Sequence, residues 1–135
     1  MSPDPVQRWH AIVETADLAG LDALLDDDVV FHSPVMHTPQ RGKALTKMYL
    51  AAAYRVLVND AFHYVSEARG ERHAVLEFVT ELGAVEINGV DMMWWNDEGR
   101  LVRFKVMVRP LKAIDALRAR MLAMLGAGGA GGRNT

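Results

Sequence analysis

The sequence contains no cysteine, and this absence excludes several kinds of chemistry. Disulfide frameworks, thiolate catalysis and zinc sites built on sulfur all require cysteine. An excess of one charge sign is missing as well, because 15 basic and 17 acidic residues leave a net charge of -2. No stretch combines clustered lysine or arginine with aromatic side chains, so nucleic acid is not expected as a partner.

Long hydrophobic runs are also missing. No apolar run approaches the length that spans a bilayer, and the first residues have neither the positive region nor the apolar stretch of a secretory signal. We therefore expect a protein of the reducing cytoplasm with no membrane partner. Half of the 135 residues are hydrophobic, which is enough for one core. The chain is predicted to form a single domain over residues 1–125, followed by a disordered glycine-rich tail over residues 126–135.

Helical spacing of apolar residues dominates the first part of the chain. Asp4 and Pro5 form a helix start signal, and apolar residues then recur at helical spacing as far as Ala16. A shorter helix is predicted to begin at Asp17 and to end at the acidic run 26–28, because acidic residues at a helix C-terminus oppose the helix dipole. Two more helices are predicted, over residues 43–58 and 111–125.

The remaining segments have the pattern of strands. Residues 29–33 are rich in β-branched and aromatic residues and are followed by Pro34. The turn at residues 96–99 contains Asn, Asp and Gly, which suit a hairpin. Four further strands are predicted, over residues 61–69, 73–82, 85–95 and 101–108. Helices followed by hairpin-linked strands predict an α+β domain, with a curved antiparallel sheet wrapped around three N-terminal helices and a C-terminal helix in addition.

Asp91 is the residue that points most directly to a function, because it lies inside the apolar stretch from Val90 to Trp95. A carboxylate in an apolar interior must be paired, hydrogen-bonded or held protonated. Two interpretations stay open: a pocket acid that faces a ligand, or a buried carboxylate that pairs with an arginine or bonds a neighbouring helix. Strand alternation places Met93 and Trp95 on the same face as Asp91.

Short motifs occur along the chain in a recognisable order: Arg8-Trp9, Ala16-Asp17-Leu18, Asp27-Asp28-Val29, Ser33-Pro34, Arg41-Gly42-Lys43, Val90-Asp91 and Glu98-Gly99-Arg100. With these motifs, and with three helices ahead of a hairpin-rich sheet, the chain from Val6 to Pro110 resembles the nuclear transport factor 2-like superfamily. Within it, the chain is similar to the SnoaL-like polyketide cyclases and to ketosteroid isomerase. The resemblance implies a cone-shaped fold around a mostly apolar pocket, and a homodimer that forms through the sheet.

The resemblance to ketosteroid isomerase also implies roles for three residues. In that enzyme one carboxylate moves a proton, while a tyrosine and a protonated aspartic acid hydrogen-bond the developing enolate. The base position falls on Ser33, the tyrosine position on Trp9 and the protonated acid on Asp91. A serine does not abstract a proton unless a histidine or carboxylate activates it, and a tryptophan donates a hydrogen bond but does not ionise. Asp91 is the one residue that keeps its role intact.

Other candidate site residues surround these three. His37 follows the Ser33-Pro34 turn and is a reserve base, whereas strand alternation points His32 away from Ser33. No pair of metal-binding residues has the helical spacing of a zinc motif, so neither a metal nor a cofactor is expected. The predicted ligand contacts, all of them first of all core residues, are Trp9, Met48, Tyr49, Met93, Phe104, Val106 and Val108.

Together these features predict a protein that binds a small hydrophobic carbonyl compound. If the protein is an enzyme, the resemblance implies a cofactor-free isomerase or cyclase that transfers a proton, with Asp91 as acid or base and Ser33 as a hydrogen-bond donor. The loss of the isomerase base favours a second possibility, a non-catalytic carrier or sensor. A third is a dimeric association module whose cone is filled by side chains. An enzyme needs a proton acceptor beside the ligand, whereas a carrier needs the pocket alone.

Overall fold

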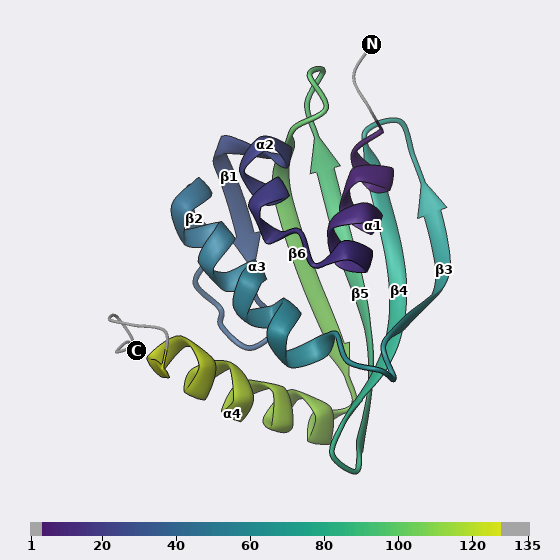
Figure 1. The fold of residues 1–135 in the computed structure, drawn as a ribbon, viewed down its shortest axis with the longest axis vertical. Helices are drawn as coiled ribbons and strands as arrows, with labels where there is room; N and C mark the ends of the chain where they lie inside the picture. The colour runs from purple at the N-terminus through teal and green to yellow at the C-terminus, as the bar shows by residue number, and fades with distance from the viewer. Residues whose placement is uncertain (1–3, 128–135) are drawn as a thin grey trace.

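A computed structural model describes residues 4–127 of the chain, in which helices cover one face of a six-stranded sheet (Figure 1). Residues 126–127 of the predicted glycine-rich tail are helical, and the rest of that tail, from residue 128 onward, lies outside the described residues. Among the described residues, no helix combines the length and the apolar character that crossing a membrane requires. The elements are α1 (Pro5–Thr15), η1 (Leu18–Gly20), α2 (Leu21–Leu24), β1 (Leu25–His32), β2 (Gln40–Arg41), α3 (Lys43–Leu57), β3 (His63–Arg69), β4 (His73–Leu82), β5 (Val85–Trp95), β6 (Leu101–Arg109) and α4 (Leu111–Ala127).

The sheet has the strand order β2-β1-β6-β5-β4-β3. Strands β3 to β6 pair as antiparallel neighbours, and β1 pairs with β6 in parallel. The helices α1 and α3 lie over one face of this sheet, and α4 crosses its end below α3 (Figure 1). The predicted α+β class, with a curved sheet, N-terminal helices and a closing C-terminal helix, is confirmed.

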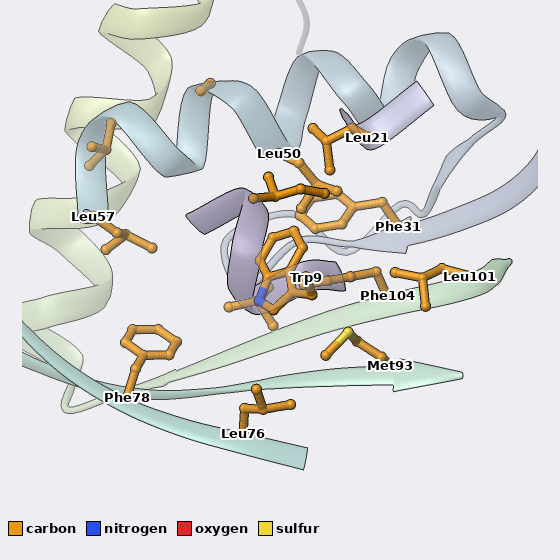
Figure 2. Packing of buried hydrophobic residues seen from close by; sticks show 14 of the residues in the cluster. Trp9, Leu21, Phe31, Leu50, Leu57, Leu76, Phe78, Met93, Leu101 and Phe104 are labelled. Atoms are coloured by element: carbon orange, nitrogen blue, oxygen red, sulfur yellow. The ribbon is translucent and has the colours of Figure 1, made fainter. Parts of the chain in front are cut away.

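The core lies between the inner face of the sheet and the helices (Figure 2). Alternation along β4 buries Ala74, Leu76 and Phe78 in turn. Trp9 of α1 packs against Phe104 of β6 with 4.9 Å between ring centroids. Each large side chain that is removed from water contributes about 1.5–3 kcal/mol to the stability of the fold. This packing fixes the inner face of α1 against the middle of the sheet.

The start and end of α1 follow directly from the sequence. The side chain of Asp4 accepts a hydrogen bond from the backbone N–H of Val6, and Pro5 occupies the first turn, where its missing N–H costs nothing. The helix ends at Thr15, and the next residue, Ala16, has a left-handed φ of 58°. Between these limits Val6, Trp9 and Ile12 share the buried face, so the indole of Trp9 points toward the sheet.

The acidic run 26–28 does not end a helix, contrary to the prediction. The helix α2 ends at Leu24, and the three aspartates lie inside β1. Leu24, Leu25 and Val29 are fully buried on either side of them. The pairing of β1 with β6 shifts register between Leu25 and Val30, so the acidic segment is irregular and leaves Asp27 and Asp28 exposed. Burial of the flanking apolar residues therefore decides where the strand begins.

Gly89 in β5 permits a close approach of side chains beside Asp91. A Cβ atom at this position would lie 2.5 Å from Cζ of Phe78 and 2.8 Å from the carbonyl oxygen of Met107. Both distances are shorter than a carbon atom tolerates, and one of the two groups is backbone. The missing side chain thus makes room for the ring of Phe78, which forms part of the wall described below.

Candidate functional site

An apolar cavity of about 50 Å³ lies between the inner face of the sheet and the helices α1, α3 and α4. Its polar lining residues are Trp9, Ser33, Tyr54, Tyr64 and Asp91. Ligand pockets usually measure ~300–1,000 Å³, so the cavity as it stands is small. The remaining lining residues are Val13, Phe31, Pro34, Leu50, Ala53, Leu57, Val58, Phe62, Phe78, Phe104, Val106, Leu117 and Met121.

Asp91 reaches this cavity from the middle of β5. It pairs with Leu76 on β4 and with Val106 on β6, so it stands in the centre of the sheet, and its side chain is only 7% exposed. The hydroxyl of Tyr64 donates a hydrogen bond of 2.6 Å to Oδ2 of Asp91. Among the described residues the second oxygen, Oδ1, has no hydrogen-bond partner. That oxygen is the one available to a ligand.

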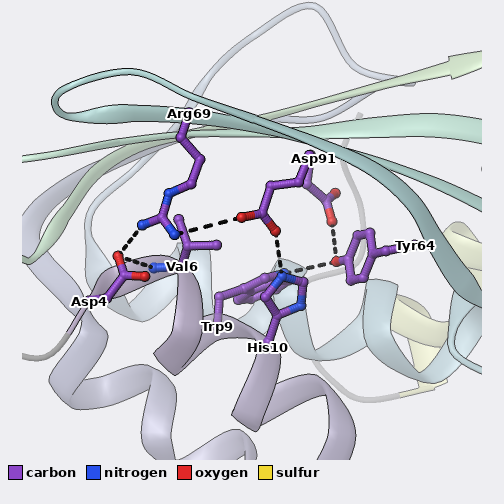
Figure 3. Close-up of polar contacts among 8 residues, drawn as sticks. Asp4, Val6, Trp9, His10, Tyr64, Arg69 and Asp91 are labelled. Carbon is purple, nitrogen blue, oxygen red and sulfur yellow. Dashed lines mark hydrogen bonds and ion pairs between the residues drawn. The ribbon is translucent and has the colours of Figure 1, made fainter.

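Tyr64 links Asp91 to Trp9 and completes a three-residue relay (Figure 3). Its hydroxyl accepts a hydrogen bond of 2.9 Å from Nε1 of Trp9 while it donates to Asp91. Phe62 packs edge-on against the Tyr64 ring with 5.1 Å between centroids. The tyrosine comes from β3, an edge strand whose pairing with β4 shifts register just after Tyr64. Because the Tyr64 hydroxyl both accepts from Trp9 and donates to Asp91, it holds Oδ2 of Asp91 in place.

The surroundings of Asp91 set its protonation near neutral pH. Burial raises the pKa of Asp91 from 3.8 to about 7, while the hydrogen bond from Tyr64 and the proximity of His10 act in the opposite direction. Burial, and then the neighbouring Asp91, hold the pKa of Tyr64 well above its usual value of 10. The tyrosine therefore stays protonated and donates a hydrogen bond, whereas Asp91 can either give or take a proton at neutral pH.

A polar cluster outside the cavity fastens α1 to β3 (Figure 3). Nε2 of His10 lies 2.9 Å from Oε1 of Glu67, and Arg69 bonds both Glu67 and Asp4. The ring of His10 also stands edge-on to Tyr64, with 5.1 Å between centroids. Each such surface ion pair contributes only about 0–1 kcal/mol, so their joint effect is mainly to position the helix. The cluster thereby keeps Trp9 and Tyr64 within bonding distance.

Ser33 lies on the cavity wall, but no histidine activates it. Its Oγ accepts a hydrogen bond of 3.1 Å from the backbone N–H of Val35, so the serine proton remains available to a ligand. His32 lines an open depression on the other side of this wall, as does the exposed His37. Burial and the charges of nearby Lys105, Arg103 and Arg41 lower the pKa of His32. Ser33 is therefore suited to donate a hydrogen bond rather than to take a proton.

The structure brings together five of the ten predicted site residues: Asp91, Ser33, Trp9, Phe104 and Val106 line one cavity. The other five lie elsewhere. His37 and Val108 line the outer depression, and Tyr49 lines a separate small cavity. Met48 is 48% exposed, because the face of α3 that meets the cavity carries Leu50, Ala53 and Leu57 instead. Met93 is fully buried in the core away from the cavity.

Several cavity residues were not predicted from the sequence: Tyr64 and Phe62 on β3 or just before it, Tyr54 on α3, Phe78 on β4, and Leu117 and Met121 on α4. One signal could have pointed to Tyr64, since a buried indole N–H needs an acceptor. Among residues 4–127, no group of three or more histidine, aspartate or glutamate side chains is arranged to hold a metal ion.

Comparisons with known proteins identify the family and the fold. A sequence model of the SnoaL-like domain matches residues 6–104. A steroid delta-isomerase from Pseudomonas aeruginosa is 36% identical, with a TM-score of 0.88 over 92% of this chain and 90% of that chain. A Silicibacter pomeroyi protein with a cystatin-like fold is 28% identical, with a TM-score of 0.81 over 88% and 83% of the two chains.

More distant structures share the fold alone. An NTF2-like protein of unknown function from Mesorhizobium loti is 17% identical, with a TM-score of 0.67 over 78% of this chain and 88% of that chain. No curated protein matches the chain. The family model and the 36% identical structure thus agree on the family, and the other solved structures share the fold.

Proposed function

The chain belongs to the SnoaL-like domain family, within the nuclear transport factor 2-like superfamily, and we propose that it binds a small apolar carbonyl compound and transfers a proton on it. One observation carries this proposal: Asp91 is a buried carboxyl group with a pKa of about 7, and one of its oxygens is free on the wall of an apolar cavity. A carboxyl group that is half ionised at neutral pH is suited to acid–base catalysis.

The proposed reaction is an isomerisation that needs no cofactor. The ionised Oδ1 of Asp91 removes a proton from a carbon next to the ligand carbonyl and forms an enolate. The hydroxyl of Ser33 donates a hydrogen bond to the developing oxyanion. The protonated Asp91 then returns the proton to another carbon of the conjugated system, so that a double bond moves and no atom is gained or lost. Throughout, Tyr64 holds Oδ2 of Asp91 in position.

The relative from Pseudomonas aeruginosa supports this class of reaction, because it is described as a steroid delta-isomerase and is 36% identical. The position of the isomerase base, however, falls on Ser33. Among residues 4–127 the cavity lining includes one carboxyl group, Asp91, and no histidine. A single carboxyl group must therefore both remove and return the proton, on one side of the substrate.

The experiment is an isomerisation assay on β,γ-unsaturated ketones of increasing size, followed through the ultraviolet absorbance of the conjugated product. We expect turnover by the wild type and a loss of about two orders of magnitude or more in Asp91→Asn, which cannot accept the proton. Asp60→Asn removes an exposed carboxylate and is the control. Equal turnover by wild type and Asp91→Asn would exclude Asp91 as the proton-transfer group.

A non-catalytic carrier or sensor is the second candidate, and the serine in the base position favours it. A carrier would bind ketones without converting them. Thermal denaturation with steroids, flat polyketide-like aromatics and terpenoid ketones separates the two, because binding to the native state raises the melting temperature. Stabilisation that Asp91→Asn loses, together with no turnover, would support the carrier. A filled association module is disfavoured, since an apolar cavity lies beside Asp91.

We also propose that the outer face of the sheet forms a homodimer. This face carries Val90, Met92 and Trp94 from β5, and the neighbouring Met107 of β6 is 50% exposed. On one side of this apolar strip lie Arg103 and Lys105 of β6, and on the other side lies Glu77 of β4. A two-fold axis near β5 would bring opposite charges together. Sedimentation equilibrium of wild type and Met107→Asp tests it: a monomer in both would refute the dimer.

A further inference from the structure

A second cavity of about 60 Å³ lies next to the cavity of Asp91. The two cavities share two lining residues, Ser33 and Met121, so these side chains form the partition between them. Beyond the partition the walls come from the segment after β1, from α3 and from α4. They consist of Val35, Met36, Tyr49, Arg118, Leu122 and Leu125.

One side chain of the partition, that of Met121, can move. Met121 is unbranched and has three rotatable bonds, so a change of rotamer displaces its end without any shift of the backbone. It lies one turn after Leu117, which lines the first cavity, and its neighbours Leu122 and Leu125 line the second. A rotation of Met121 would therefore join the two cavities into one channel beneath α4.

One charged residue lines the second cavity. Arg118 is exposed, and it is the one charged residue among those that line the second cavity. Among the described residues it forms no ion pair with a carboxylate. The other lining residues of the second cavity are mostly apolar. A guanidinium group on the wall of a mostly apolar cavity is suited to bind a planar anion such as a carboxylate.

We infer that the site takes a chain-like ligand with two polar ends: a carbonyl group beside Asp91, an apolar chain that passes Met121, and a carboxylate that meets Arg118. This inference rests on the proposed function for the carbonyl end, and it adds the shape and the charge of the ligand. Two small cavities that one side chain can join favour a flexible chain over a fused ring system. The outer depression with His37 and Lys105 also adjoins the first cavity, but it is open to solvent and has a mixed polar lining.

The experiment compares two ligands of equal chain length, 9-oxodecanoate and 2-decanone, by isothermal titration calorimetry. Wild type is expected to bind the carboxylate roughly two- to fivefold more tightly, which is typical of an exposed ion pair. Arg118→Gln is expected to lose this preference and to keep its affinity for 2-decanone. Arg120→Gln, an exposed arginine of the same helix that lines neither cavity, is the matched control and keeps the preference.

Two further variants make the result decisive. Met121→Ala shortens the movable side chain of the partition, so its ratio of affinities for long over short oxo acids is expected to rise. This ratio is measured within one protein and is independent of any loss of stability. If Lys105→Gln rather than Arg118→Gln removes the carboxylate preference, or if wild type has none, the channel is refuted. Binding of 2-decanone that depends on Asp91 would leave the proposed function standing in that case. No binding of either ligand refutes the chain-like ligand, and the isomerisation assay then decides the proposed function by itself.

Discussion

The hydrogen bond from Tyr64 to Asp91 offers the sharpest test of the site. Tyr64→Phe removes only the hydroxyl group, which lies 2.6 Å from Oδ2 of Asp91 and lowers the pKa of that carboxyl group. A hydrogen bond to a charged group contributes about 1.5–3 kcal/mol, and one pKa unit corresponds to about 1.4 kcal/mol. The pKa of Asp91, about 7 in the wild type, should therefore rise by roughly one to two units in the variant.

The assay is an NMR titration of the Asp91 carboxyl carbon in protein labelled at aspartate. Tyr54→Phe is the control, because Tyr54 lines the same cavity but directs its hydroxyl to the carbonyl oxygen of Val13, at 3.4 Å. An unchanged or lower pKa of Asp91 in Tyr64→Phe would refute the relay. An equal rise in both variants would show that cavity polarity, and not the specific bond, controls the carboxyl group.

Three further predictions follow from burial and packing. The pKa of Asp91 is raised from 3.8 to about 7, so the folded protein binds a proton that the unfolded chain releases between these pH values. The free energy of unfolding of the wild type should therefore fall by about 4 kcal/mol relative to that of Asp91→Asn as the pH rises from about 4 to 7, and urea denaturation at several pH values measures it. The same pH dependence of the free energy of unfolding in both proteins would contradict this prediction. Gly89→Ala should cost about 1–3 kcal/mol, because its Cβ would meet Phe78 and the backbone of Met107; a neutral effect in urea denaturation would contradict the close approach. Leu117→Ala should lower the free energy of unfolding by about 2–5 kcal/mol and enlarge the cavity. If calorimetry gives the same affinity of an apolar ketone for this variant and for the wild type, the cavity has collapsed.

Most of the fold could be predicted from local sequence signals. The cap at Asp4, the glycine of the turn before Leu101 and the alternation along β4 each act over a few residues, and all three features are present. The boundary between α2 and β1 was predicted wrongly, because the dipole argument for the acidic run is worth only about 1 kcal/mol. Burial of Leu24, Leu25 and Val29 is worth several times more.

The site was only partly predictable, and the reason is geometric. Asp91 and Trp9 are single polar or aromatic positions whose orientation follows from the period of one strand or one helix. Tyr64 depends on the register of an edge strand, which shifts immediately after it. Met121 depends on how α4 crosses the end of the sheet. Registers and crossings arise from packing among distant segments, and local periodicity does not encode them.

The energetics of Asp91 argue that this residue serves a function and not the fold. An uncharged side chain of the same shape would avoid the roughly 4 kcal/mol that the ionised carboxyl group costs above neutral pH. The surrounding residues offer no cation bonded to it, only the hydroxyl of Tyr64. The site therefore keeps a group that weakens the fold at the pH where its proton is exchangeable. Such a group is expected where a proton must be given and taken, and the opposite slopes of stability and activity against pH would test that connection.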